Sequence, residues 1–266
     1  MKYVTLFKEL KSLLNTLMLE ESIAQIIFED FLGKNYHIYL DDEVKEIHLE
    51  RLNNDIIPRL KRKEPIQYIL GYTYFYGLKI NVNYNVLIPR NETEELVEWL
   101  LDNHQEESLT LLDIGSGSGC IALAIKRHRP NWKVISIDIS NEALEVAKNN
   151  AISLNIDVDF RNSNLLENVS EDIDIVISNP PYIAKDDEFV DDATNTYEPH
   201  LALYAEDKGL EFYKEFSKTL PSKKVRELYI EFGFKQAKDI IDIFSNYQVK
   251  IRKDLNKLDR MARIIF

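Results

Sequence analysis

Apolar residues recur at helical spacing through the N-terminal part of the chain. They are Leu6, Leu10, Leu13, Leu14, Leu17, Ile23, Ile26, Ile27 and Phe31. Spacings of three and four residues place such side chains on one face of a helix. A further helical stretch runs from about residue 41 to residue 60, and Pro58 is expected to kink it because proline lacks the backbone N–H. Residues 1–72 are therefore predicted to form a small all-α domain.

The pattern changes at Tyr72, where aromatic and β-branched residues begin a rough alternation with polar ones. Gly77 lies between two such runs and suits a tight turn. Residues 73–90 are therefore predicted to form a β-hairpin that links two domains. A helix follows, and either Asn91 or Thr93 is expected to cap its N-terminus through a side-chain oxygen.

From residue 109 onward, strand-like apolar runs alternate with helical ones. The expected strands are 109–113, 133–138, 158–161, 173–178, 227–232, 247–252 and 261–266, and the expected helices are 120–129, 142–154, 209–220 and 235–244. This alternation predicts a mostly parallel sheet with helices on both faces. No helix separates the last two strands, so they are expected to pair antiparallel. Residues 91–266 are predicted to form one α/β domain around a seven-stranded sheet.

The composition narrows the possible functions. The chain carries a formal net charge of −12, whereas a protein whose main task is to grip a nucleic-acid backbone usually presents a basic surface. No apolar run is long enough for a membrane span, and the N-terminus lacks the cleavage site of a signal peptide. The single cysteine, Cys120, excludes an internal disulfide and fits a reducing cytoplasm. The histidines are scattered without ligand spacing, so no metal site is expected.

A glycine-rich turn joins the strand at 109–113 to the helix at 120–129. In this turn Gly115, Gly117 and Gly119 alternate with Ser116 and Ser118. Glycine permits unusual backbone dihedrals and a close approach to a ligand, and the helix that follows presents free N–H groups. The spacing G-x-G-x-G differs from the G-x-G-x-x-G of dinucleotide-binding enzymes, so a nicotinamide cofactor is less favoured.

Two further positions suit a bound nucleoside. Asp138 ends the second strand, where a carboxylate can accept hydrogen bonds from both hydroxyls of a ribose; alternatively, Asp138 caps the helix that begins near Asn141. Asn164 and Leu165 follow the third strand and would supply an amide and an apolar wall for adenine. Asn164 is equally an ordinary turn residue.

The strongest chemical signal is Asn179-Pro180-Pro181-Tyr182, which follows an apolar strand. Ligand crevices in open α/β sheets lie at the carboxyl ends of strands. Two prolines remove two N–H donors, so the Asn179 side-chain oxygen and the Pro180 carbonyl remain as acceptors for the two hydrogens of an NH₂ group. Tyr182 offers a flat surface for a planar substrate. This pattern predicts methylation of a planar amide or amine nitrogen.

The chain resembles the PrmC/HemK family, the release-factor glutamine N5-methyltransferases. The resemblance rests on PIQYILGYTYFYG, VLIPRNETEELV, DIGSGSGCIALA and SNPPYI and covers about residues 65–250. The family's EP-x-x-AL and E-I-G-x-x-Q patterns match Glu198-Pro199 with Ala202-Leu203, and Glu231-Phe232-Gly233 with Gln236. Asn91 replaces a proline that the family usually has.

The resemblance implies a class I, Rossmann-like methyltransferase fold. It implies that S-adenosylmethionine is the methyl donor, bound by residues 115–119 and 138, and that S-adenosylhomocysteine is the product. It also implies that residues 179–182 bind and methylate the glutamine of the GGQ loop in peptide chain release factors. The helical domain is expected to recognise this protein substrate, and the enzyme is expected to act in the cytoplasm as a monomer.

Two other functions stay open at this point. An adenine-N6 nucleic-acid methyltransferase also acts on a planar NH₂, but it needs a DNA-reading domain or a basic face, and only about 26 residues separate Tyr182 from Gly209. A catalytically silent binding module would keep the fold. The presence of Asn179 and Asp138 argues against the silent module, and a methyl-transfer assay distinguishes the three.

Overall fold

The chain forms two compact units, Met1–Gly71 and Tyr72–Phe266. The computed structural model describes residues 1–187 and 190–266. Each unit has its own hydrophobic core. No helix in the described part of the chain is long and apolar enough to cross a membrane.

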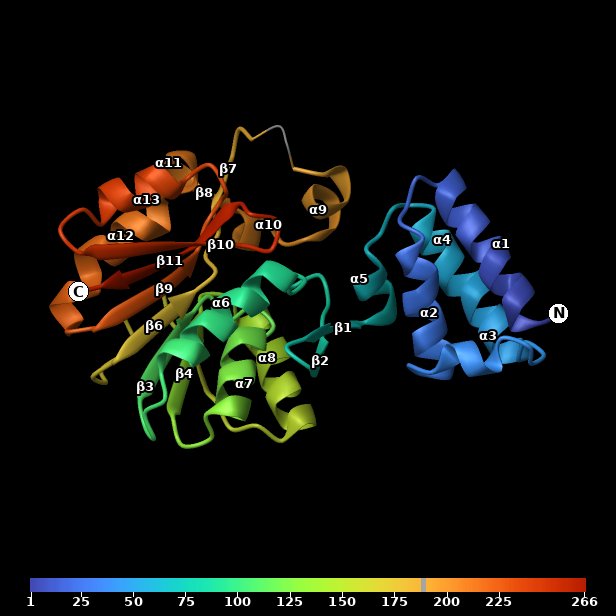
Figure 1. Cartoon of the computed structure of the whole chain (residues 1–266), viewed down its shortest axis with the longest axis horizontal. Coiled ribbons are helices and arrows are strands. Elements are labelled where there is room, and N and C mark those ends of the chain that lie inside the picture. Colours follow the sequence, from blue (N-terminus) through green and yellow to red (C-terminus); the bar gives the residue numbers. More distant parts are fainter. Residues whose placement is uncertain (188–189) are drawn as a thin grey trace. The chain divides into compact units, whose positions relative to one another are not determined.

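The N-terminal unit is all-helical (Figure 1). Its elements are α1 (Tyr3–Thr16), α2 (Ser22–Leu32), η1 (Tyr36–Tyr39), α3 (Glu46–Arg51), η2 (Leu52–Ile56), α4 (Ile57–Leu60) and α5 (Ile66–Leu70). The third helical stretch begins at Glu46 and not near residue 41 as predicted. Its middle, η2, is a π-helical turn directly before Pro58. Proline has no N–H for the preceding turn, and a wider turn is one way for a helix to absorb that loss.

The second unit opens with a β-hairpin of β1 (Tyr72–Phe75) and β2 (Leu78–Asn81). Tyr76 and Gly77 both have positive φ, at 48° and 78°, which is the conformation that two-residue hairpin turns require. Asn150 attaches the hairpin to the rest of the unit. Its side chain accepts from the Asn81 N–H at 2.8 Å and donates to the Asn81 carbonyl at 2.9 Å.

A seven-stranded sheet in the order β10-β11-β9-β6-β3-β4-β5 forms the centre of the second unit. Its strands are β3 (Thr110–Ile114), β4 (Lys133–Asp138), β5 (Asp159–Asn162), β6 (Ile175–Ser178), β9 (Glu227–Glu231), β10 (Gln248–Lys253) and β11 (Asp259–Ile265). β11 runs opposite to the other six strands of this sheet and pairs antiparallel with both β10 and β9. The predicted α/β fold, with a mostly parallel seven-stranded sheet and an antiparallel C-terminal pair, is therefore confirmed.

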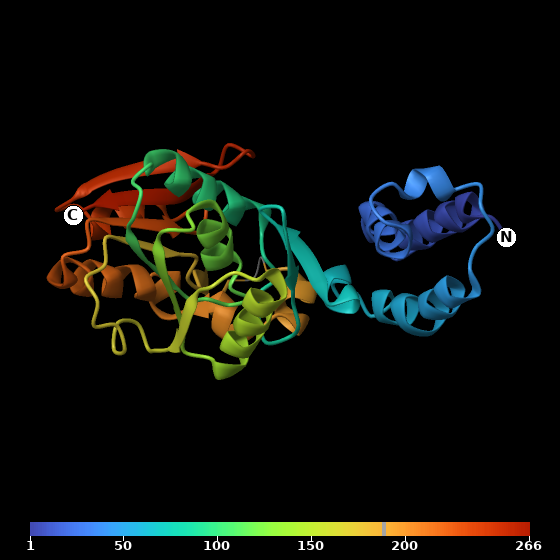
Figure 2. The same cartoon turned by 90° about the horizontal axis from the view of Figure 1, so that it is seen from below.

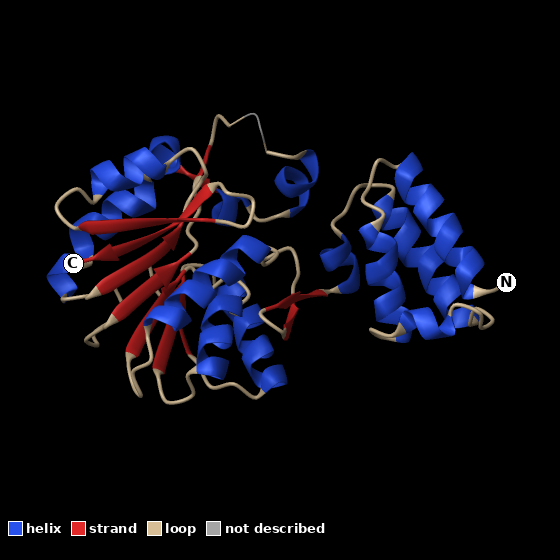
Figure 3. Ribbon diagram, viewed as in Figure 1, coloured by secondary structure: helices blue, strands red, loops and turns tan. Residues whose placement is uncertain are grey.

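Helices cover both faces of this sheet, as Figures 2 and 3 show. The main ones are α6 (Asn91–Asn103), α7 (Cys120–His128), α8 (Asn141–Leu154), α12 (Glu211–Thr219) and α13 (Ala237–Ile243). Shorter elements lie between β6 and β9: β7 (Ile183–Ala184), α9 (Asp192–Tyr197), α10 (His200–Leu203), β8 (Tyr204–Ala205), α11 (Glu206–Gly209) and η3 (Pro221–Lys223). The helix predicted from residue 209 starts later, because Gly209 has a φ of +80° and separates α11 from α12.

The start of α6 differs from the prediction in a way that matters for the site. The helix begins at Asn91 with Arg90 in the capping position, and no side chain caps it. Thr93 does not cap the helix, because its hydroxyl donates to the buried carboxylate of Glu231 at 2.6 Å. The residue proposed as a cap is therefore a link between α6 and the end of β9.

The core beneath the sheet gives a stability prediction. Leu112 of β3 is fully buried in the cluster that α12 and α13 cover, so Leu112→Ala should lower the free energy of unfolding by about 2–5 kcal/mol through lost burial and a cavity. Ile152→Ala, at a side chain that is 78% exposed, should change it by less than about 0.5 kcal/mol. Urea unfolding followed by tryptophan fluorescence checks both, since Trp99 and Trp132 lie in the second unit. Equal effects would show that this core does not hold the unit together.

Candidate active site

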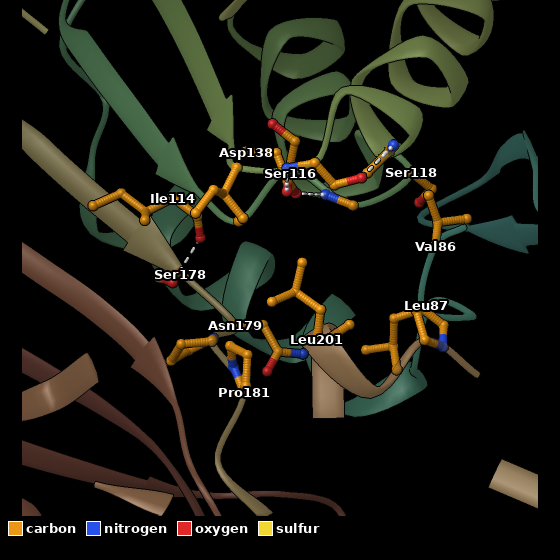
Figure 4. Close-up of a pocket in the computed structure, with 18 of the residues that line it drawn as sticks. Val86, Leu87, Ile114, Ser116, Ser118, Asp138, Ser178, Asn179, Pro181 and Leu201 are labelled. Carbon is orange, nitrogen blue, oxygen red and sulfur yellow. Dashed lines mark hydrogen bonds between the residues drawn. The ribbon is translucent and has the colours of Figure 1, made fainter. Parts of the chain in front are cut away.

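A pocket of about 500 Å³ lies in the second unit at the carboxyl ends of β3, β4 and β6. Figure 4 shows residues from these strand ends facing segments that are distant in sequence, among them Val86, Leu87 and Leu201. Of the residues predicted to bind the methyl donor or the substrate, all but Gly119 and Tyr182 line this pocket. Parallel strands meet at one edge of the sheet, so residues from separate βα units converge there.

The glycine-rich turn forms one wall of the pocket. Nothing lies within 4 Å of the position that a Cβ would take on Gly115 or Gly117, so a ligand can approach this backbone closely. Gly119 is required for another reason. It precedes α7 with a φ of +80°, and a Cβ there would lie 3.1 Å from the Cβ of Ala147. Gly119 thus lets α7 and α8 pack together behind the pocket.

Asp138 is connected to this turn. Its carboxylate accepts from the Gly117 N–H and from the Ser140 N–H, both at 2.9 Å. The capping alternative for Asp138 is wrong, because the Ser140 hydroxyl caps α8 by accepting from the Ala143 N–H. Burial raises the pKa of Asp138, and the backbone N–H donors oppose that rise. Each carboxylate oxygen can accept more than one hydrogen bond, so capacity remains for a diol in the pocket.

Two buried groups lie behind the turn. Asp113 accepts from the Ser136 hydroxyl at 2.7 Å, and Ser136 contacts Ser116; burial raises the pKa of Asp113 to about 7. Burial also raises the pKa of Cys120 to about 12. The thiol is therefore protonated near neutral pH, which fits a small buried side chain and not a nucleophile.

Asn164 and Leu165 lie on the same side of the pocket as Asp138. Asn164 is exposed and its amide donates to Glu167 at 3.1 Å, an interaction that leaves its carbonyl oxygen for a purine edge. Leu165 packs against the main core of the unit and supplies an apolar surface. The cavity size, the open glycine backbone, the Asp138 carboxylate and the Asn164 carbonyl oxygen together fit a nucleoside with a short polar tail.

The segment after β6 forms the opposite side of the pocket. Asn179, Pro180 and Pro181 line it, while Tyr182 turns its hydroxyl towards Glu231 at 3.2 Å. The backbone at Tyr182 is fixed from behind, where Gln236 donates to its carbonyl at 3.1 Å. A Cβ on Gly209 would lie 2.1 Å from the same carbonyl oxygen, so only glycine fits there.

Asn179 has a defined hydrogen-bond partner. Its side-chain Nδ2 donates to Thr93 Oγ1 at 2.9 Å, and Thr93 donates in turn to Glu231. Among the hydrogen bonds of residues 1–187 and 190–266, none engages the Asn179 side-chain oxygen. In the sequence, Glu231 and Gln236 stand out only as family patterns and Thr93 as a possible helix cap, so their place in the site was not predicted.

An ion pair between the half-buried Arg90 and the buried Glu198 holds the remaining wall. Arg90 pairs with Glu198, and the other oxygen of Glu198 accepts from the Ile88 N–H at 3.0 Å. Glu198 is 4% exposed, so both of its oxygens are satisfied inside the protein. This contact fastens the segment before α6 to α10, and Pro199 and Leu201 then cover the pocket.

Comparison with known proteins identifies the family. The release factor glutamine methyltransferase of Streptococcus pneumoniae is 38% identical over 91% of this chain and 87% of its own length. That of Enterococcus faecalis is 42% identical over 85% of this chain and 84% of its own. The chain belongs to the release factor glutamine methyltransferase family.

The fold comparison agrees with this family. A model of the methyltransferase small domain family matches residues 91–199. The N-terminal domain of human METTL16, solved in complex with SAH, superimposes with a TM-score of 0.51 at 17% identity, covering 84% of each chain. The chain is thus an S-adenosylmethionine-dependent methyltransferase, and the acceptor groups of the pocket suit the nucleoside of this methyl donor.

The assignment of Asp138 to the methyl donor gives a second prediction. Asp138→Ala should weaken the binding of S-adenosylmethionine by about 1–3 kcal/mol, because hydrogen bonds to a charged group are lost. Isothermal titration calorimetry measures this directly. Asp157→Ala is the matched control, since Asp157 carries the same charge, is exposed and lies outside the pocket. An affinity equal to that of the unaltered enzyme would remove Asp138 from the binding site.

Proposed function

We propose that this enzyme methylates the side-chain amide nitrogen of the glutamine in the GGQ loop of peptide chain release factors. The observation that carries the proposal is the orientation of Asn179: Thr93 takes up its NH₂ group, and its amide oxygen is left at the pocket wall beside Pro180. The relatives at 38% and 42% identity, named for this activity, support the same substrate.

Two acceptors at this wall suit the two hydrogens of a glutamine amide. The Asn179 oxygen and the Pro180 carbonyl each accept one N–H, which holds the substrate nitrogen in a fixed place and direction. An amide nitrogen is a weak nucleophile because its lone pair is delocalised into the carbonyl. Holding both N–H bonds directs the remaining electron density of the nitrogen towards the methyl donor.

S-adenosylmethionine supplies a methyl group on a positively charged sulfur. The chain's own residues bind and orient the two reactants in line, with the nucleoside end against Asp138 and the amide against Asn179. The nitrogen–carbon bond forms as the sulfur–carbon bond breaks, and the nitrogen then loses one proton to solvent. No strong base is needed before the attack. Tyr182, predicted as a stacking surface for the amide, lies outside the pocket lining; its contacts with Glu231 and Gln236 hold the segment that carries Asn179 and Pro180.

We further propose that the helical unit recognises the release factor and takes no part in the chemistry. The residues that line the pocket all belong to residues 84–212, within the second unit. The helical unit has a separate core, so it is able to act as a docking module. We expect the enzyme to work as a monomer in the cytoplasm, where its substrate is found.

Transfer of a labelled methyl group tests the proposal. Purified release factor should accept the label on the glutamine of its GGQ loop, and duplex DNA of the same concentration should accept none. Labelling of adenine in DNA with no labelling of the release factor would instead support an adenine-N6 nucleic-acid methyltransferase. An absence of transfer to either would favour a silent binding module.

The role of Asn179 gives a third prediction. Asn179→Ala should lower turnover by about a hundredfold or more, which is the cost of losing one oriented hydrogen-bonding group in a transition state. The affinity for S-adenosylmethionine should change by less than about tenfold, or 1.4 kcal/mol. Steady-state kinetics on release factor and calorimetry with the methyl donor measure the two effects.

Asn179→Asp is the matched variant. A carboxylate keeps an acceptor, so part of the activity should survive where Asn179→Ala has lost it. Near wild-type turnover by Asn179→Ala would contradict the proposed mechanism.

A fourth prediction concerns the division between the two units. A fragment of residues 72–266 should still bind S-adenosylmethionine, because the whole pocket lies within it. Its activity should fall far more on intact release factor than on a short peptide that contains the GGQ sequence. The ratio of the two kcat/KM values, compared with the full chain, measures this. An equal loss on both substrates would reject a docking role for the helical unit.

A further inference from the structure

Thr93 connects the substrate-facing amide to a buried acid. Its hydroxyl lies between Asn179, from which it accepts at 2.9 Å, and Glu231, to which it donates at 2.6 Å. These three residues come from α6, from the segment after β6 and from the end of β9. Thr93 and Glu231 are only 2% and 1% exposed, so the hydrogen bond between them is shielded from water.

Glu231 sets the direction of the hydrogen bonds that link it to Thr93 and Asn179. An ionised carboxylate can only accept hydrogen bonds, so the single hydrogen of the Thr93 hydroxyl points to Glu231. The Thr93 oxygen is then able only to accept from Asn179. An asparagine amide has a donor end and an acceptor end, and the two differ little in shape. Because Thr93 demands the donor end, the acceptor end is presented to the pocket.

Burial raises the pKa of Glu231, and the donors around it favour the ionised form that accepts from Thr93. Its second oxygen accepts from the Tyr182 hydroxyl at 3.2 Å, and the Arg260 guanidinium favours the charged form. Both hydroxyls donate to the carboxylate, an arrangement that stabilises a buried charge.

We propose that Thr93 and Glu231 are positioning residues that fix the Asn179 amide with its oxygen towards the substrate. This inference rests on the proposed function, because it requires Asn179 to accept a hydrogen bond from the substrate amide. A reversed amide would present its NH₂ to the substrate NH₂. Two donors would then face each other, and the nitrogen could not be held for attack.

Substitution of Thr93 tests the inference. Thr93→Val keeps the shape of the side chain and removes both the donor and the acceptor, so the amide of Asn179 loses its constraint. The turnover on release factor should fall by about tenfold or more, as expected when an oriented hydrogen-bonding group loses its support. The affinity for S-adenosylmethionine, measured by calorimetry, should stay within about threefold. Thr93→Ser restores the hydroxyl and should recover most of the turnover.

Tyr213→Phe is the matched control. The Tyr213 hydroxyl is also buried and also contacts Glu231, but it donates to the main-chain carbonyl, at 2.9 Å, and not to the carboxylate. Its removal should lower the melting temperature and leave kcat within about twofold. If Tyr213→Phe and Thr93→Val reduce kcat equally, the effect is a general loss of stability and the inference is wrong.

A double mutant separates positioning from other effects. If Thr93 acts through Asn179, adding Thr93→Val to Asn179→Ala should cause no further loss of kcat, whereas independent effects would multiply. Glu231→Leu should lower kcat as far as Thr93→Val does. If Glu231→Leu does not fold, the kcat values of the Thr93 variants test the inference by themselves. Wild-type kcat in Thr93→Val with a large loss in Asn179→Ala would overturn this inference only. Wild-type kcat in Asn179→Ala would overturn the proposed function.

Discussion

A carboxylate that is buried away from water has to be surrounded by hydrogen-bond donors, and this requirement at Glu231 organises the catalytic end of the molecule. The acid lies at the carboxyl end of β9, where the adjacent β6 also ends. Its donors come from α6 and from the segment that follows β6. Leaving such a group without partners would cost several kcal/mol, so the three segments are held together. The orientation of Asn179 follows from the same set of contacts.

The parallel sheet separates the two tasks of the pocket. The ends of β3 and β4 carry the glycine turn and Asp138, and these groups suit the nucleoside of the methyl donor. The end of β6 carries the acceptors that suit the substrate amide. Since neighbouring parallel strands end at the same edge of the sheet, the proposed sites for the methyl donor and the amide adjoin without any single segment having to form both. The Gly117 N–H donates to Asp138 and so holds the glycine turn, as the hydroxyls that donate to Glu231 hold the segment after β6.

Much of this arrangement follows from the sequence because it depends on local patterns. Apolar runs and their spacing predict the seven-stranded sheet and its final antiparallel pair, and the G-x-G-x-G turn and Asn179 are chemically distinctive where they stand. The structural roles of Thr93, Gly209 and Glu231 could not be predicted in this way. Thr93 has the ordinary features of a helix cap, but its hydroxyl donates to a residue 138 positions away. Gly209 is needed only because the Tyr182 backbone passes beside it. Such requirements come from tertiary packing and leave no local pattern.

A crystal structure of the enzyme with S-adenosylhomocysteine and a glutamine-containing release-factor peptide would test the central claim most directly. We expect the glutamine side-chain nitrogen to lie within about 3.2 Å of both the Asn179 side-chain oxygen and the Pro180 carbonyl oxygen, the usual range of a hydrogen bond. The Asn179 nitrogen should remain on Thr93. A glutamine whose carbonyl oxygen, in place of its nitrogen, faces Asn179 would contradict the account.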